Sequence, residues 1–261
     1  MQNLFSLKGK VIVITGGAGH LGSAMTEAFL DYGAIVYITS RNSHNTKQMI
    51  EKNERDFEGK LFFVEMDVTS TDSVKEGIKK ILQREQKIDV LVNNAYSGKT
   101  GELLTGNEQD WLDSFNSSIH GTYRVTKEVL PIMIENKGGS IINISSMYGL
   151  VSPDPSIYGN SMQNNPPQYG AAKAAICQFT RYLAGHFGYL NIRANCIAPG
   201  PFPNETAQKN KAFISKLAEK NPMKRIGKPD DLKGIAVLLA SDASSYINGQ
   251  VISVDGGWTI W

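Results

Sequence analysis

Lys10-Val-Ile-Val-Ile-Thr15 runs directly into Gly16-Gly-Ala-Gly-His-Leu-Gly22. A short run of β-branched residues that is apolar almost throughout is typical of a strand buried in a parallel sheet. The glycines after it predict a tight turn that opens a helix, which we expect to continue to about Tyr32. Such a turn lets a pyrophosphate approach the backbone at a helix N-terminus. The stretch therefore predicts a nucleotide-binding strand, turn and helix, with a simple tight turn as the alternative.

The rest of the chain repeats this alternation of strand and helix. Strands are predicted at 34–39, 61–66, 88–92, 140–145, 192–197 and 251–254, and helices at 45–57, 71–85, 111–135, 167–187 and 229–240. Strands that alternate with helices imply βαβ units and a parallel, doubly wound sheet. Since no stretch has the composition of a linker, we predict a single Rossmann-type α/β domain over residues 1–261, with a seven-stranded parallel sheet.

Composition excludes several classes of protein. Hydrophobic residues make up 41% of the chain and charged residues 20%, as in ordinary globular proteins. The formal net charge is +2 with no basic block, so neither nucleic acid nor an anionic membrane is indicated as a partner. No segment resembles a signal peptide or a membrane span. Cys177 and Cys196 lie in apolar patterns without zinc-ligand spacing, which predicts buried thiols in a reducing cytoplasm and no metal site.

Tyr169-Gly-Ala-Ala-Lys173 is the strongest candidate for chemistry. Asn165 can cap a helix whose first turn suits Pro166 and Pro167. A tyrosine and a lysine four positions apart then share one helix face. A nearby ammonium favours phenolate and would draw the tyrosine pKa from about 10 toward neutrality, which makes Tyr169 a usable proton donor or acceptor. A hydroxyl from Ser146 could hold a substrate oxygen beside it, although this spacing also occurs in helices by chance.

The end of the second predicted strand carries information on the choice of cofactor. An acidic residue there would accept hydrogen bonds from the ribose hydroxyls of NAD, but this chain has Ser40-Arg41. Arg41 can pair with a 2′-phosphate, so the sequence favours NADP, with NAD as the alternative if Arg41 is only a solvated charge. Asp67, which precedes Val68 after the third strand, is placed to bond the adenine amine. Asp-Val-Thr is equally a helix-capping sequence.

With these motifs in order, the chain resembles the short-chain dehydrogenase/reductase family over nearly its whole length. The matching segments are Thr15-Gly-Gly-Ala-Gly-His-Leu-Gly22, Asn93-Asn-Ala95, Ile144-Ser-Ser146, Tyr169-x-x-x-Lys173, Asn195-Cys-Ile-Ala-Pro-Gly200 and Gly249-Gln-Val-Ile-Ser-Val-Asp-Gly-Gly257. The resemblance implies that Tyr169 is the acid/base, that Lys173 bonds the nicotinamide ribose, and that Ser146 orients the substrate oxygen. It also implies cofactor contacts from the glycine loop (Gly16, Gly19, His20, Leu21 and Gly22), from Asn94 and Ala95 on the adenosine side, and from Pro199, Gly200 and Phe202 on the nicotinamide side.

The chain departs from the family pattern at three positions. His20 replaces the middle glycine of the loop, so its imidazole either lies on the phosphates or points to solvent. Tyr96 follows Asn-Asn-Ala where the family has glycine, and it either narrows the pocket as a substrate contact or caps the sheet. The family's fourth catalytic residue is an asparagine that kinks its helix and holds a water; its position corresponds to Ser118 here, not Asn116. A serine can still bond water or a carbonyl, so Ser118 is the candidate.

Two polar segments are expected near the predicted site: an insertion before Tyr169 and a lid after Gly200. Tyr169 lies 23 positions after Ser146, farther than in the family, and the extra residues form an insertion at 151–168. Tyr158 has the more usual spacing, but its partner four positions on is Met162, which cannot supply a cation. The amides Asn160, Gln163, Asn164 and Asn165 suit hydroxyl-rich ligands, unless the insertion is only a surface loop. Residues 201–221 correspond to the family's mobile substrate lid and are polar.

The resemblance implies reversible hydride transfer between a nicotinamide and a secondary alcohol or ketone. The polar insertion and lid favour a sugar, sugar acid or polyol, and the tail from Asp255 to Trp261 resembles gluconate-5-dehydrogenase-like and flagellin-modification sugar enzymes. A 3-ketoacyl group on a carrier and a nucleotide-binding regulator without catalysis are the alternatives. Similar proteins form dimers or tetramers, and apolar Trp258, Ile260 and Trp261 at the chain end fit this, unless they pack in their own core.

Overall fold

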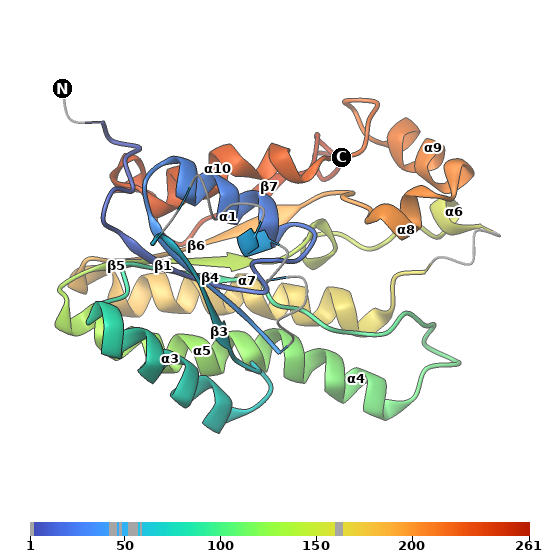
Figure 1. The fold of residues 1–261 in the computed structure, drawn as a ribbon. Helices are drawn as coiled ribbons and strands as arrows, with labels where there is room; N and C mark the ends of the chain where they lie inside the picture. Colours follow the sequence, from blue (N-terminus) through green and yellow to red (C-terminus); the bar gives the residue numbers. More distant parts are fainter. Residues whose placement is uncertain (1–2, 42–45, 47–48, 52–56, 58, 160–163) are drawn as a thin grey trace.

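The computed structural model describes residues 3–41, 46, 49–51, 57, 59–159 and 164–261. One sheet of seven strands, all parallel, has the order β3-β2-β1-β4-β5-β6-β7 (Figure 1). The strands are β1 (Val11–Thr15), β2 (Ile35–Ser40), β3 (Leu61–Glu65), β4 (Val90–Asn93), β5 (Gly139–Ile144), β6 (Ile192–Pro199) and β7 (Val251–Val254). The chain winds outward from β1 to β3 and then returns to β4 on the other side of β1. The predicted doubly wound parallel sheet is confirmed.

Helices cover both faces of the sheet because successive strand residues point in opposite directions. Ile12 and Ile14 belong to the core under α1 (Gly22–Asp31) and α10 (Lys233–Ala240). Val11 and Val13 belong to the core on the other face. That face is covered by α3 (Thr71–Glu85), α5 (Gly121–Glu135) and α7 (Pro167–Phe187), which lie below the sheet in Figure 1. The continuous apolar strands are therefore explained by burial on both faces.

Two helices have the bounds that the sequence predicted, but the residue that precedes one of them is not the predicted cap. α3 begins where expected because the Ser70 hydroxyl accepts a hydrogen bond from the Ser73 N–H at 3.3 Å. α7 begins at Pro167 with Pro166 in the cap position, so the cap expected at Asn165 is wrong. Proline needs no N–H partner in a first turn, and no side-chain cap is formed. The predicted helix 45–57 falls largely outside the described residues, of which 46 and 49–51 are helical.

The long helix predicted over 111–135 is interrupted. α4 (Glu108–Phe115) begins earlier, capped by the Asn107 side chain, and a π-helical turn at Asn116–His120 separates it from α5. A π turn inserts an extra residue and is common at functional sites. The single-helix prediction failed here because apolar periodicity does not distinguish a bulged helix from a regular one.

The insertion and lid segments contain short helices that the sequence analysis did not predict. They are α6 (Pro155–Tyr158), α8 (Glu205–Gln208) and α9 (Lys211–Lys220), and a 3₁₀ turn at Met147–Gly149 precedes the insertion. Further 3₁₀ turns lie at Gly188–Leu190, Pro229–Leu232 and Asp242–Ser244. Ile157 of the insertion packs with Phe213 and Leu217 of the lid and with Trp258 in a small separate core. The described part of the insertion is therefore held against the lid and the C-terminal tail.

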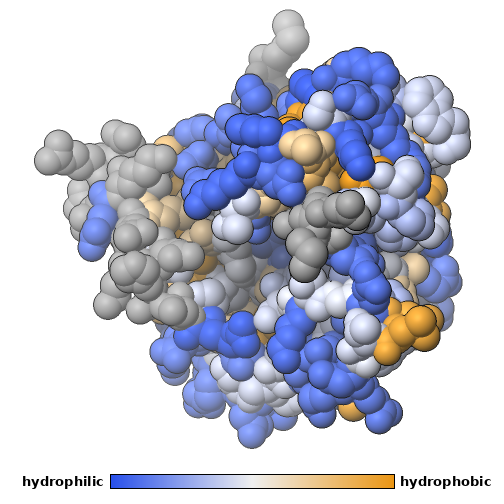
Figure 2. All heavy atoms as spheres, turned by 90° about the vertical axis from the view of Figure 1, so that its right-hand side faces the viewer, coloured by the Kyte–Doolittle hydropathy of each residue, from blue (hydrophilic) through white to orange (hydrophobic). Residues whose placement is uncertain are grey.

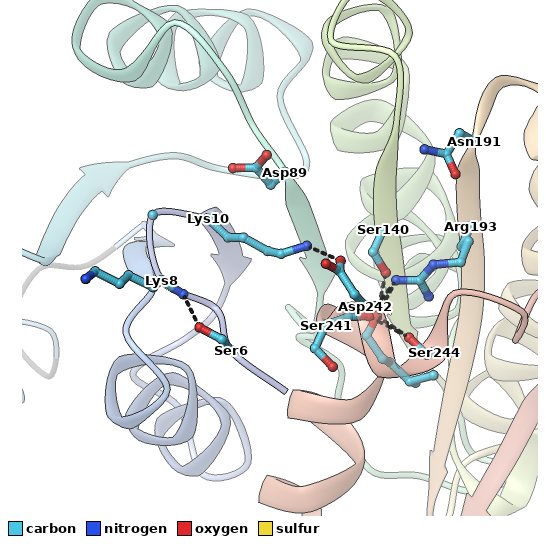
Figure 3. A network of polar contacts seen from close by, with 12 residues as sticks. Ser6, Lys8, Lys10, Asp89, Ser140, Asn191, Arg193, Ser241, Asp242 and Ser244 are labelled. Atoms are coloured by element: carbon cyan, nitrogen blue, oxygen red, sulfur yellow. Dashed lines mark hydrogen bonds and ion pairs between the residues drawn. The ribbon is translucent and has the colours of Figure 1, made fainter. Parts of the chain in front are cut away.

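The opposite, amino-terminal edge of the sheet is fixed by a polar network (Figure 3). At the start of β6, the Arg193 guanidinium donates to the carbonyls of Leu239 and Ser241 at 3.1 and 3.2 Å. These carbonyls end α10, where a cation is stabilised by the helix dipole. Lys10, just before β1, pairs with Asp242 at 2.8 Å. α10 is thereby attached to the sheet far from the strand ends that carry the candidate site.

No helix among the described residues is long and apolar enough to cross a membrane.

Cys177 on α7 and Cys196 on β6 are buried free thiols, as the sequence predicted. Of the tail residues, Trp258 packs in the protein's own core with 4% of its surface exposed. Ile260 and Trp261 are 70% and 77% exposed.

Candidate active site

A cleft of about 620 Å³ lies at the carboxyl ends of the strands, where the sheet order reverses between β1 and β4. The strands end toward the right in Figure 1, and Figure 2 shows that face, which is mostly hydrophilic and hollowed near its centre. Most of the predicted site residues line this one cleft. They are Gly16, Gly19, His20, Leu21, Ser40, Arg41, Asp67, Val68, Asn94, Ala95, Tyr96, Ser146, Tyr169, Lys173, Pro199, Gly200 and Phe202. Gly22 and Ser118 do not line it.

The glycine loop is a turn that side chains would obstruct. Gly16 has a φ of +66°, which favours glycine. A Cβ on Gly19 would lie 3.1 Å from the Gly16 carbonyl oxygen, and one on Gly22 would lie 2.3 Å from the same atom. Gly22 therefore acts by letting α1 start directly against the loop. The first turn of α1 contains no acidic residue, so its N-terminus presents N–H groups without a competing negative charge.

Asn94 holds the glycine loop in place from the neighbouring strand. Its amide nitrogen donates to the carbonyls of Thr15 and Gly16 at 2.9 and 3.0 Å. In return the Thr15 hydroxyl accepts the N–H groups of Asn94 and Ala95 at 2.9 and 3.0 Å. Thr15 is not among the predicted site residues, although a hydroxyl at the end of a buried strand is a visible signal.

The adenosine end carries the other predicted polar residues. Asp67 accepts from the N–H and hydroxyl of Thr69 at 2.9 and 2.7 Å, so one carboxylate oxygen serves the local turn. It does not cap the following helix, because the N-cap of α3 is Ser70. Asp67 also lines the cleft. Arg41 and His20 are exposed along the cleft, at the end of β2 and in the glycine loop.

Tyr169, Lys173 and Ser146 come together at the other end of the cleft. Lys173 is only 4% exposed, and its ammonium donates to the Ile144 carbonyl at 2.8 Å. The ammonium lies 5.7 Å from the centroid of the Tyr169 ring. The Ser146 hydroxyl hydrogen-bonds to Tyr169 and also accepts from the Tyr148 N–H at 3.1 Å. The four-residue spacing on α7 thus places both side chains beside the end of β5.

Burial dominates the protonation of this group. It raises the pKa of Tyr169, while the hydrogen bond from Ser146 acts in the opposite direction. Burial also lowers the pKa of Lys173 to about 8. The downward shift expected for the Tyr169 pKa is therefore not found, because desolvation of the buried phenolate outweighs the hydrogen bond from Ser146.

Tyr96 packs beside this group and lines the cleft. Its ring meets the Tyr169 ring edge-on at 5.1 Å between centroids, and the Lys173 ammonium lies 5.3 Å from the Tyr96 centroid. The Tyr96 hydroxyl is 3.2 Å from the Ser114 hydroxyl. The residue therefore fills space beside the acid/base candidate, from the cleft side.

Ser118 is in the π turn but points away from the cleft. It is 1% exposed, and its hydroxyl has no hydrogen-bond partner among the described residues. Its neighbour Ser117 lines the cleft, where its hydroxyl donates to the Ser97 carbonyl. Ser117 is not among the predicted site residues, because a regular helix was expected here, whereas the π turn changes which serine faces the site.

A family model described as enoyl-(acyl carrier protein) reductase matches residues 16–259. The chain belongs to the short-chain dehydrogenase/reductase family. The 3-oxoacyl-[acyl-carrier-protein] reductase FabG of Thermotoga maritima is 38% identical over 256 residues, covering 97% of this chain and 99% of that protein. A gluconate 5-dehydrogenase from Burkholderia cenocepacia, solved with NADP and tartrate, has a TM-score of 0.89 at 29% identity, covering 99% and 98%. A short chain dehydrogenase from Leptospira borgpetersenii with bound NAD+ has a TM-score of 0.87 at 28% identity, covering 99% and 96%.

The protein is therefore a short-chain dehydrogenase/reductase enzyme that uses NAD or NADP. The residues present fit a dinucleotide. The glycines keep the loop free of side chains, so that phosphates can approach its backbone. The cleft continues from that loop to Tyr169. The cleft therefore offers one continuous surface on which the phosphates, the riboses and the nicotinamide ring of a dinucleotide can all find partners.

Proposed function

We propose that this enzyme interconverts a secondary alcohol and a ketone on a sugar, sugar acid or polyol. The observation that carries the proposal is the meeting of Ser146, Tyr169 and Lys173 where the cofactor cleft joins a second cavity of about 390 Å³. The described polar residues of that cavity include Asn164, Asn165 and Asn204. The solved gluconate 5-dehydrogenase, similar over nearly the whole chain, supports the same substrate class.

A nicotinamide dinucleotide held in the cleft would supply hydride transfer to or from the substrate. The glycine loop and α1 would hold its pyrophosphate, Ser40 and Arg41 the adenosine ribose, and Pro199, Gly200 and Phe202 the nicotinamide side. Ser146 donates to the substrate oxygen and positions it beside Tyr169. In reduction Tyr169 gives its proton to that oxygen, and in oxidation it takes the proton back. Lys173, fixed by the Ile144 carbonyl, stabilises the phenolate that forms.

Several assignments remain part of this proposal. Residues 201–221 would close over the site as a lid, and the whole chain would act as one domain. The buried thiols agree with a reducing cytoplasm. Tyr96 would border the substrate from the cofactor side, beside Tyr169. Ser118 would hold a water within the π turn through its buried hydroxyl, which is unpartnered among the described residues.

A 3-oxoacyl thioester is the second candidate substrate, favoured by the 38% identity to FabG. One assay separates the two. Oxidation and reduction of NADP and NAD are followed at 340 nm with sugars, sugar acids, polyols and an acetoacetyl thioester. Turnover of a carbohydrate supports the proposal, and turnover of the thioester alone refutes it.

We expect Arg41→Ala to shift the cofactor preference from NADP toward NAD by at least about tenfold in kcat/KM, because a charge-assisted bond contributes about 1.5–3 kcal/mol. The change should appear in the KM of NADP, while the KM of NAD stays within about twofold. The exposed Arg181, on α7, provides the control variant Arg181→Ala. An unchanged preference would show that Arg41 is only a surface charge.

We further expect a dimer or tetramer. Trp261 and Ile260 are 77% and 70% exposed at the chain end, and Leu112 and Tyr123 on α4 and α5 are about half exposed. A dimer or tetramer would cover these apolar side chains, which are costly to leave in water. Light scattering at micromolar concentration should give two or four times the mass of 28.6 kDa. A mass equal to one chain would refute the expectation.

A further inference from the structure

The second cavity lies between the insertion and the lid, and it opens onto Ser146 and Tyr169. Its walls come from the 3₁₀ turn after β5, the end of α6, the residues before α7, and α8 and α9. The volume of about 390 Å³ suits a small molecule. Most of its lining residues lie outside the family motifs, so those motifs do not determine its chemistry.

The walls carry no formal charge among the described residues. Two lysines of α9 are engaged within the protein: Lys220 pairs with Asp154 and lies 5.5 Å from the centroid of the Trp258 ring. Lys216 donates to the Ser156 carbonyl at 3.3 Å. A carboxylate placed in this cavity would find no cation among the described lining residues to replace the water that it loses. The charge balance therefore disfavours a sugar acid.

Two tyrosines offer neutral hydrogen-bonding groups instead. The hydroxyls of Tyr148 and Tyr158 are 2.8 Å apart, so one donates to the other and one O–H remains for a ligand. Burial raises the pKa of both phenols, which keeps them protonated at neutral pH. Such a pair both donates and accepts, as the hydroxyl groups of a carbohydrate do.

Asn165 adds a hydrogen-bond acceptor that has no donor in the described part of the chain. Its Oδ1 is buried and has no hydrogen-bond partner among the described residues. The side chain does not cap α7, because Pro166 holds the cap position, and it lines the cavity. A buried polar atom without a partner is costly, and a ligand hydroxyl that donates to it removes that cost.

An aromatic surface completes the cavity. The rings of Tyr158 and Phe213 stack with centroids 5.9 Å apart and an angle of 28°. Phe202, from the lid, lines the same space. Aromatic walls with a few placed polar groups are typical of small-molecule sites, and they suit the apolar face of a carbon ring.

We infer that this cavity is a subsite for a neutral polyhydroxylated ring or chain, with the Tyr148–Tyr158 pair and Asn165 binding its hydroxyls. The inference rests on the proposed function and narrows it: sugars and polyols are substrates, whereas sugar acids are poor ones. The reacting carbon lies toward Ser146 and Tyr169, and the remaining hydroxyls lie toward α6 and α9.

The first test compares matched neutral and anionic probes on the wild-type enzyme. Sorbitol is paired with gluconate, and glucose and myo-inositol with glucuronate, using both cofactors. We expect kcat/KM for the neutral probes to exceed that for the acids by at least about tenfold. Equal or better turnover of the acids would overturn this inference and leave the proposed function intact. Turnover of the acetoacetyl thioester alone would overturn both.

The second test uses Tyr158→Phe and Asn165→Ala with the best neutral probe. Each variant should raise the substrate KM about three- to tenfold while kcat and the cofactor KM stay within about twofold. Tyr158→Phe keeps the ring that packs on Phe213, so folding is preserved. The exposed residues Tyr189 and Asn136 provide the controls Tyr189→Phe and Asn136→Ala. Unchanged KM values in both test variants, or a loss confined to kcat, would overturn the subsite.

Discussion

Tyr169→Phe should lose about 10²–10⁴-fold in kcat, in both directions of the reaction, because it removes only the hydroxyl that transfers the proton. The ring stays, so its contacts with Tyr96 and the Lys173 ammonium are retained. Cofactor affinity, measured by nucleotide fluorescence or calorimetry, should therefore change by no more than about threefold. Steady-state rates at 340 nm with the best neutral substrate give the loss directly.

Tyr182→Phe is the matched control, since Tyr182 lies on the same helix and is half exposed. It should keep wild-type kcat. A Tyr169→Phe variant that retained more than about a tenth of the activity would contradict the acid/base role and direct attention to another proton donor. A variant that lost cofactor binding as well would show that the hydroxyl has a structural role instead.

Much of the fold could be predicted from the sequence because its signals are local. Lys10–Thr15 is apolar almost throughout since β1 is covered on both faces, and Tyr169 and Lys173 meet because four residues make about one helical turn. The parallel, doubly wound sheet also followed from the alternation of strands and helices. These features depend on neighbours in sequence, so composition and spacing are sufficient to indicate them.

The features that the sequence did not reveal depend on contacts between distant segments. The π turn at Asn116–His120 determines that Ser117, not Ser118, faces the cleft. The insertion packs on α9 through residues more than fifty positions away, which no local pattern records. The pKa of Tyr169 is governed by burial, a property of the assembled site rather than of the Tyr-Lys spacing.

Lys173→Met should abolish most activity yet leave the protein at least as stable. A fall in the lysine pKa from 10.5 to about 8 means that charging this group costs the folded state about 3 kcal/mol at pH 7. Methionine removes that cost, while the Ile144 carbonyl loses its donor at about 1–3 kcal/mol. We therefore expect no loss of stability, or a gain of up to about 2 kcal/mol, together with a fall in kcat of at least about 10²-fold.

The difference in stability between the wild type and Lys173→Met should also depend on pH. Below pH 8 the lysine is charged in both the folded and unfolded states, so the wild type bears the full cost. Between about 8 and 10.5 the folded lysine is neutral while the unfolded one still binds a proton, so wild-type stability should rise with pH relative to the variant. Urea unfolding of both proteins at pH 7, 8.5 and 9.5 measures the difference, with the exposed Lys127→Met as control. A constant difference across this range would show that Lys173 is not a buried cation, and its proposed role in stabilising the Tyr169 phenolate would then fail.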